Sequence, residues 1–228
     1  MLDFIKKPII IGKTYTIADL NTSRRALSSI DIKSKISILI IDDEEFLYKE
    51  DLRDEKYNIK CVKAIEDLSA ASEYPIVICD VKGVGTQFDA EMGGAYVIRE
   101  LKKKYPFKQY AVYSGSDYKL DLMSNLEGVA TIKKDAPLEM WRGYCDELIR
   151  RASDPKENWK TLRDFLLKND VALTEVLRLE SNFVDIYNNR PADMKFFPDE
   201  KQFPNIGQDL RAIIQSMIAG GILHMLGI

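Results

Sequence analysis

The sequence predicts an α/β fold in which a doubly wound, five-stranded parallel sheet is followed by an α-helical C-terminal region. Short apolar runs alternate with helix-like segments over residues 36–153, the pattern of a parallel sheet covered by helices on both faces. After Asp154-Pro155 the strand pattern ends and apolar residues recur at helical spacing. We therefore expect an N-terminal extension (1–35), an α/β domain (36–153) and a helical region (154–228).

Each expected strand is rich in Ile, Val or Tyr, which favour the pleated surface of a sheet. The strands are expected at Ile36–Ile41, Ile59–Ala64, Ile76–Cys79, Gln109–Tyr113 and Val129–Ile132. The segments that can bury one apolar helical face are Phe46–Asp54, Ile65–Ser72, Gly94–Lys104, Tyr118–Leu126 and Leu138–Arg151. Doubly wound sheets bind ligands beyond the carboxyl ends of their strands, so a site is expected at that edge.

In the two terminal parts of the chain the spacing of apolar residues gives fewer secondary-structure signals. In the C-terminal region we expect helices around Trp159–Leu166 and Leu173–Leu179, a proline-containing loop over Asn188–Pro204, and a last helix over about Ile206–Met225. In the N-terminal extension only an apolar run at Pro8–Ile11 and a possible helix near Ala18–Ser29 are indicated.

The composition is that of a folded protein, with 46% hydrophobic and 30% charged residues. The net charge of −3 gives no general attraction to nucleic acid or to an anionic membrane. Cys61, Cys79 and Cys145 are widely spaced and form no CxxC pair, which favours a reducing cytoplasm. The N-terminus lacks the form of a signal peptide, and the most apolar stretch, Ile213–Ile228, falls short of the roughly 20 residues that span a bilayer. We expect a cytoplasmic protein without a membrane segment.

Acidic residues stand at the ends of two expected strands. Asp42 and Asp43 directly follow the first strand, and Asp80 ends the third. Because the carboxyl ends of parallel strands face the same way, these three carboxylates are expected to converge. Converging carboxylates repel each other unless a cation neutralises them, and hard oxygen ligands suit Mg²⁺. The sequence therefore predicts a magnesium site.

A hydroxyl and an ammonium group complete this predicted pocket. Ser114 ends the fourth strand and Lys134 follows the fifth. Carboxylates, a hydroxyl and an ammonium suit phosphoryl transfer, in which a protein mainly positions an in-line attack and neutralises charge. Asp80 would be the nucleophile and would form an acyl phosphate. A register shift of one residue would exchange Lys134 with Lys133.

Residues 36–153 resemble the receiver domain of two-component response regulators, which has a flavodoxin-like fold. The matching pieces are Ile-Leu-Ile-Ile-Asp42-Asp43-Glu44, Ile-Val-Ile-Cys-Asp80, Val-Tyr-Ser114-Gly115-Ser116 and Ile-Lys133-Lys134-Asp135. The resemblance implies that Asp80 accepts a phosphoryl group from a histidine kinase or phosphotransfer protein acting in trans, with Lys134 pairing with this group and Ser114 moving to hydrogen-bond it. The implied metal ligands are Asp42, Asp43, Asp80 and Lys82. Such a domain is a phosphoacceptor for signalling and catalyses only its own phosphorylation and dephosphorylation.

The sequence departs from this family at several positions. The segment Val81–Met92, next to the expected site, is longer than usual and rich in glycine. Thr131 stands where the family often has a switch aromatic, and Asp135 replaces a frequent proline after Lys134. Lys82 stands where aspartate-nucleophile phosphatases have a second Asp, which argues against a phosphatase.

Three outputs are compatible with the C-terminal region. Over residues 155–228 there are five Lys and four Arg against six Asp and four Glu, and no helix concentrates its basic residues on one face. This argues against a DNA-binding transcriptional regulator. We favour a helical module that binds a protein effector or a second copy of the chain. An output-less or degenerate receiver, acting as a phosphate sink or binding module, is the other alternative. His224, the only histidine, lacks the surroundings of a phosphotransfer motif. The phosphoryl group therefore has to come from another protein or a small phosphodonor.

Overall fold

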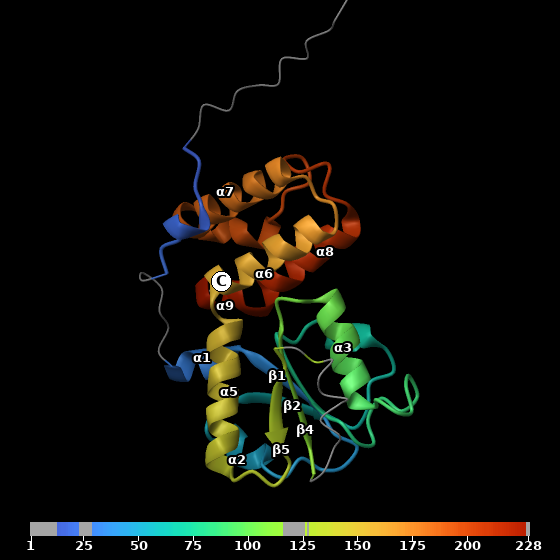
Figure 1. Cartoon of the computed structure of the whole chain (residues 1–228). Coiled ribbons are helices and arrows are strands. Elements are labelled where there is room, and N and C mark those ends of the chain that lie inside the picture. Colours follow the sequence, from blue (N-terminus) through green and yellow to red (C-terminus); the bar gives the residue numbers. More distant parts are fainter. Residues whose placement is uncertain (1–12, 23–28, 116–125, 127, 227–228) are drawn as a thin grey trace, which may run out of the picture.

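The structure, a computed structural model, describes residues 13–22, 29–115, 126 and 128–226 (Figure 1). Its centre is one five-stranded sheet with the strand order β2-β1-β3-β4-β5, in which every neighbouring pair is parallel. The strands are β1 (Ser37–Ile41), β2 (Asn58–Val62), β3 (Ile76–Asp80), β4 (Gln109–Ser114) and β5 (Ala130–Lys133). The predicted α/β class with a five-stranded parallel sheet is confirmed, and this strand order is compatible with a flavodoxin-like fold.

The sheet is accompanied by α1 (Ser29–Lys35), α2 (Lys49–Asp54), α3 (Gly94–Lys104) and α5 (Leu138–Ala152). α3 has the predicted bounds, and α2 begins three residues later than predicted. The predicted helix Ile65–Ser72 is only a short 3-10 helix, Leu68–Ala71, which begins after Asp67, whose side chain caps it by accepting the backbone N–H of Ser69. The helix predicted at Tyr118–Leu126 falls, except for Leu126, outside the described residues.

Successive side chains of each strand point to opposite faces of the sheet and form an apolar layer on each face. Ile38 and Ile40 of β1 belong to the layer that includes Trp141 of α5. Leu39 and Ile41 point the opposite way, into the layer that includes Val97 and other residues of α3. Since successive side chains of a strand point to opposite faces, the continuous apolar run of β1 requires a helix on each side.

The C-terminal region is helical, as predicted. It contains α6 (Pro155–Lys168), α7 (Leu173–Asn189), a 3-10 helix (Pro191–Phe196) and α8 (Gln208–Met217), which continues as a π-helix (Ile218–Ile222) into α9 (Leu223–Leu226). Asp154 caps α6 by accepting the backbone N–H groups of Lys156 and Glu157. In the part of the chain that the structure describes, no helix is both long and apolar enough to cross a membrane.

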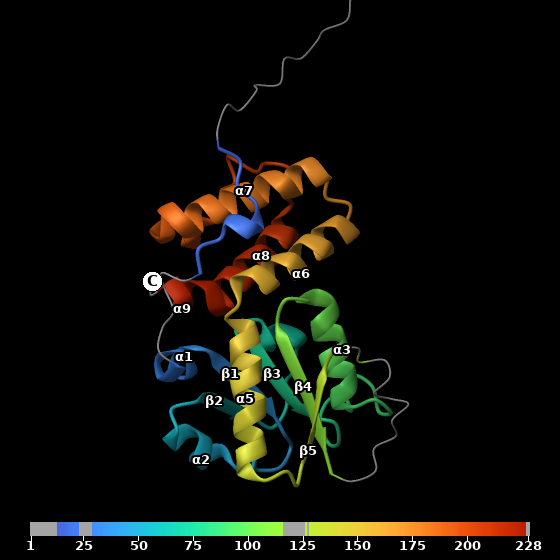
Figure 2. The same ribbon diagram turned by 60° about the vertical axis from the view of Figure 1, so that its left-hand side comes forward.

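The helical region packs onto the end of the sheet where the strands begin (Figures 1 and 2). The hydroxyl of Ser216 donates to the carbonyl oxygen of Ser72, just before β3, at 3.2 Å. The side-chain amide of Asn158 donates to the carbonyl oxygen of Ala152, the last residue of α5, at 2.8 Å. Buried side chains of α6, α7 and α8 belong to the same apolar cluster as the α3 face of the sheet. The carboxyl ends of the strands lie at the opposite edge.

The described N-terminal segment runs along α7 instead of along the sheet (Figure 2). Its backbone N–H groups at Tyr15 and Ile17 donate to Ser181 Oγ and Glu180 Oε1, at 3.0 and 2.9 Å. Leu20 is buried in the shared apolar cluster. A 3-10 helix spans Ile17–Asp19, whereas most of the possible helix predicted near Ala18–Ser29, and the apolar run at residues 8–11, lie outside the described residues.

Candidate functional site

Three carboxylates meet where β1 and β3 end. These strands are neighbours, with Ile41 opposite Cys79, so Asp42 and Asp80 leave the sheet side by side. One carboxylate oxygen each from Asp42, Asp43 and Asp80 lies within 4.8 Å of the others. The side chains of Asp42 and Asp80 are buried, and that of Asp43 is exposed. The structure thus brings together the three acidic residues singled out in the sequence.

Lys134 is the lysine that reaches these carboxylates. Its Nζ lies 2.6 Å from Asp80 Oδ2, 3.0 Å from Glu44 Oε2 and 3.6 Å from Asp42 Oδ1. Its backbone N–H donates to the carbonyl oxygen of Ser114 at 2.9 Å, which fixes the turn after β5 against the end of β4. Lys133, the last residue of β5, is exposed.

Burial and hydrogen bonding act in opposite directions on the pKa values of Asp80 and Lys134. Burial raises the pKa of Asp80, and the hydrogen bonds from Lys134 and from the backbone N–H of Lys82 counteract it. Burial lowers the pKa of Lys134, but its hydrogen bonds to Asp80 and Glu44 outweigh this and leave the pKa above its usual value. The ammonium group therefore stays charged and partly neutralises the carboxylates.

Ser114 and Lys82 lie at the carboxyl ends of β4 and β3. Ser114 ends β4, and its buried Oγ has no hydrogen-bond partner among the described residues. A buried hydroxyl without a partner has a donor to offer to an incoming oxygen. The backbone N–H of Lys82 donates to Asp80 Oδ1 at 3.1 Å, so its main chain lies beside the Asp80 carboxylate while the residue is exposed.

Two glycines allow the backbone to approach the acidic residues closely. Gly94, at the start of α3, lies so near Asp80 that a Cβ atom there would come within 1.9 Å of the Asp80 carbonyl oxygen. Gly83 has φ +76°, and a Cβ atom there would come within 2.2 Å of both carboxylate oxygens of Asp43. The glycine-rich composition of this segment was visible in the sequence, but these contacts were not.

The long segment after β3 has a defined path. Gly94 N–H donates to the carbonyl oxygen of Val81 at 3.1 Å, which closes the segment at its base. The side-chain amide of Gln87 donates to the carbonyl oxygen of Ile65 at 3.0 Å, so the segment is also tied to the chain after β2. Asp89 Oδ1 accepts two backbone N–H groups, those of Glu91 and Met92. This departure from the receiver pattern is therefore an organised loop next to the site.

Sequence reasoning missed Tyr113 as a residue of the site. Its hydroxyl donates to Asp42 Oδ2 at 2.5 Å, from the strand position just before Ser114. In the sequence Tyr113 reads as one more apolar strand residue, and its strand neighbour in register is Asp80. Only the pairing of β4 with β3, and of β3 with β1, places the phenol near Asp42.

The donor set fits a divalent cation that prefers oxygen ligands. Asp42, Asp43 and Asp80 bring three carboxylates together in a partly buried place, beside the ammonium group of Lys134. All three offer hard oxygen atoms, and no sulfur or imidazole ligand belongs to the group that the described residues form. This composition suits Mg²⁺ better than Zn²⁺.

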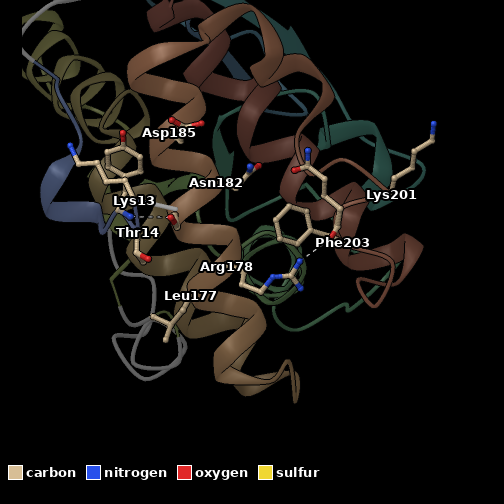
Figure 3. A pocket seen from close by; sticks show the side chains of 11 residues that line it. Lys13, Thr14, Leu177, Arg178, Asn182, Asp185, Lys201 and Phe203 are labelled. Atoms are coloured by element: carbon tan, nitrogen blue, oxygen red, sulfur yellow. Dashed lines mark hydrogen bonds between the residues drawn. The ribbon is translucent and has the colours of Figure 1, made fainter. Parts of the chain in front are cut away.

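A cavity lies elsewhere, on the helical region between the N-terminal segment, α7 and residues 201–203 (Figure 3). Its volume is about 670 Å³, and Asn182 and Phe203 line it. Two of its charged groups are already paired, because Arg178 lies 2.7 Å from Glu175 and Asp185 lies 2.6 Å from Arg190. No residue predicted for phosphoryl transfer lines this cavity.

A search against protein-family models finds no match for the chain, and a search of curated proteins finds no similar sequence.

Proposed function

We propose that this chain is a receiver-like signalling protein that accepts a phosphoryl group on Asp80 in a Mg²⁺-dependent reaction. The observation that supports it best is the Lys134–Asp80 pair, 2.6 Å apart, within a cluster of three carboxylates at the ends of parallel strands. The Oγ of Ser114 at the end of β4, which has no hydrogen-bond partner among the described residues, adds the hydroxyl that this chemistry uses. A purely structural ion pair would explain neither the clustering nor the hydroxyl.

In the proposed reaction a carboxylate oxygen of Asp80 attacks the phosphorus atom of a phosphohistidine on a kinase or phosphotransfer protein. A P–O bond forms, the P–N bond breaks, and the imidazole leaves with the electron pair and takes up a proton from water. Asp42, Asp43 and Asp80, with the main chain at Lys82 beside them, would hold Mg²⁺, which when bound neutralises charge on the phosphoryl oxygens. Lys134 would exchange its contact with Asp80 for one with the phosphoryl group, and Ser114 would donate a hydrogen bond to it.

The direct test is the intact mass of the protein after incubation with Mg²⁺ and acetyl phosphate. We expect the wild-type chain to gain the mass of one phosphoryl group and Asp80→Asn to gain none, because an amide is not a nucleophile of this kind. Asp135→Asn, which changes an exposed carboxylate on the turn just after Lys134, is the matched control and should be modified like the wild type. Chelation of Mg²⁺ with EDTA should abolish the gain.

An adduct that persists in Asp80→Asn would place the chemistry on another residue. The absence of any adduct on the wild-type chain would favour the degenerate alternative, in which the fold is kept for binding alone.

We further propose that the helical region carries the output through a protein effector or a second copy of the chain. Two leucines one turn apart on α7, Leu173 and Leu177, are 57% and 48% exposed, and apolar side chains that adjoin on a surface are typical of an interface. Sizing of the protein in Mg²⁺ with and without beryllofluoride, a phosphoryl mimic, should detect a change in oligomeric state if the partner is a second copy. With an effector, the change would appear only when that protein is added.

A further inference from the structure

The two oxygens of the Asp42 carboxylate have different surroundings. Oδ2 accepts the hydroxyl of Tyr113 at 2.5 Å. Oδ1 accepts the backbone N–H of Glu44 at 3.0 Å and lies 3.6 Å from Lys134 Nζ, which itself contacts Asp80. Oδ1 therefore lies beside Lys134, the lysine that contacts Asp80, whereas Oδ2 is held by a hydroxyl group from β4. Because the side chain of Asp42 is 2% exposed, water cannot replace these partners.

The ring of Tyr113 is itself held in place. It is 1% exposed and packs edge-on against Trp141 of α5 and Phe46, with centroids 5.2 and 6.2 Å apart. A phenol is a hydrogen-bond donor at neutral pH, and here it donates to Asp42 Oδ2. A fixed ring with a permanent donor holds a carboxylate in one orientation.

We propose that Tyr113 is a positioning residue of the metal site: its hydroxyl holds Asp42 Oδ2 so that Oδ1 faces the bound cation. The inference rests on the proposed Mg²⁺-dependent function. Groups that orient a metal ligand through its second atom contribute to metal affinity, and their removal typically weakens binding about 10- to 100-fold. Without the phenol, the Asp42 carboxylate can rotate and pair more closely with Lys134, which competes with the cation.

The test compares two tyrosines of β4. Tyr113→Phe removes the hydroxyl and keeps the ring that packs against Trp141. Tyr110→Phe is the matched control, because the Tyr110 hydroxyl is also buried and donates to the carbonyl oxygens of Leu101 and Tyr105, both at 3.0 Å, on the α3 side of the sheet. Each substitution removes one buried hydroxyl from the same strand, but only one of them contacts the acidic cluster.

The measurement is Mn²⁺ binding to the full chain, followed by the electron paramagnetic resonance signal of the free ion, with Mg²⁺ as competitor. We expect the affinity to fall about ten-fold in Tyr113→Phe and to stay within about two-fold of wild type in Tyr110→Phe. Thermal unfolding in EDTA checks that both variants fold and shows how far each hydroxyl stabilises the metal-free protein.

A second readout separates positioning from direct participation in the reaction. In the acetyl phosphate reaction, Tyr113→Phe should need about ten-fold more Mg²⁺ for half-maximal rate and should approach the wild-type rate when Mg²⁺ is saturating. Equal Mn²⁺ affinity in Tyr113→Phe and wild type would overturn the inference and leave the proposed function intact, as would an equal loss in Tyr110→Phe. A wild-type chain that binds neither ion would overturn both.

Discussion

At the scale of single residues, three buried charged side chains show how this protein satisfies polar groups inside its core. Asp42 accepts the Tyr113 hydroxyl and a backbone N–H. Glu180 accepts the indole N–H of Trp159 at 2.8 Å as well as a backbone N–H of the N-terminal segment. Lys108 donates to three carbonyl oxygens just before β3. Each of these side chains needs its hydrogen-bond partners, because a buried charge without partners is strongly destabilising.

Because of Lys108, the free energy of unfolding is expected to depend on pH. Burial lowers the pKa of the Lys108 ammonium group to about 7 from its usual value of 10.5, and the charge of Glu73 opposes this only in part. Between these two pH values the unfolded chain retains the proton while the folded chain releases it. The unfolded state therefore binds more protons, and the free energy of unfolding should rise with pH across this window. Below about pH 7 this group should contribute no slope.

The measurement is urea unfolding from pH 6 to pH 10 for wild type, Lys108→Met and the control Lys104→Met, whose lysine is exposed at the end of α3. Relative to Lys108→Met, wild type should gain up to about 1.4 kcal/mol per pH unit above pH 7. Lys104→Met should follow wild type. A constant difference between wild type and Lys108→Met across the whole range would show that Lys108 keeps its proton in the folded chain.

At the scale of elements, the N-terminal segment is an example of a structure without a local pattern. Residues 13–21 form no long helix or strand, yet they have fixed partners on α7. Asn188 of α7 completes this attachment, because its side chain both accepts the N–H of Asn21 and donates to the carbonyl oxygen of Asp19, each at 2.9 Å. The first described part of the chain and the helical region therefore form one packed unit.

Glu180→Gln tests this attachment. The Glu180 carboxylate accepts donors on both oxygens, from Ile17 and Trp159, whereas an amide offers a single acceptor oxygen. One buried donor is left without a partner, so we expect a loss of about 1–3 kcal/mol in the free energy of unfolding. Hydrogen exchange at the Ile17 amide should also become faster. Glu200→Gln, at an exposed glutamate of the same region, should stay within about 0.5 kcal/mol of wild type. Equal effects of both substitutions would contradict a specific role for Glu180.

At the scale of the whole molecule, α5 connects the acidic edge of the sheet with the helical region (Figure 1). Near its start, Trp141 packs against Tyr113, whose hydroxyl contacts Asp42. At its end, the carbonyl oxygen of Ala152 accepts the side chain of Asn158 of α6. Apolar residues of the helical region and of the α3 face of the sheet form one continuous cluster. A shared core of this kind favours a single cooperative unit.

The two tryptophans of the chain can test this cooperativity. Trp159→Phe leaves Trp141, which reports on the sheet, and Trp141→Phe leaves Trp159, which reports on the helical region. In each variant, urea unfolding followed by fluorescence should coincide with unfolding followed by far-UV circular dichroism, because loss of the shared core exposes both parts together. Separated midpoints within one variant would show two units that unfold independently and would support a domain boundary near residue 154.

Local sequence patterns alone predict the strands, the helical character of the C-terminal region and the placement of Asp42, Asp43 and Asp80 at strand ends. These features follow from periodicity and from neighbours along the chain, so they can be read locally. The same reasoning predicts a helix over Ile65–Ser72, whereas the chain there forms only a short 3-10 helix that begins after the capping residue Asp67.

Contacts between residues far apart in the sequence could be identified only from the three-dimensional structure. In the structure Lys134, and not Lys133, pairs with Asp80. The Tyr113 hydroxyl donates to Asp42, and the backbone N–H of Ile17 donates to Glu180. The last two pairs are separated by 71 and 163 positions in the chain. The physical reason is that such contacts depend on strand order and on how helices dock, which leave no periodic signal near either partner.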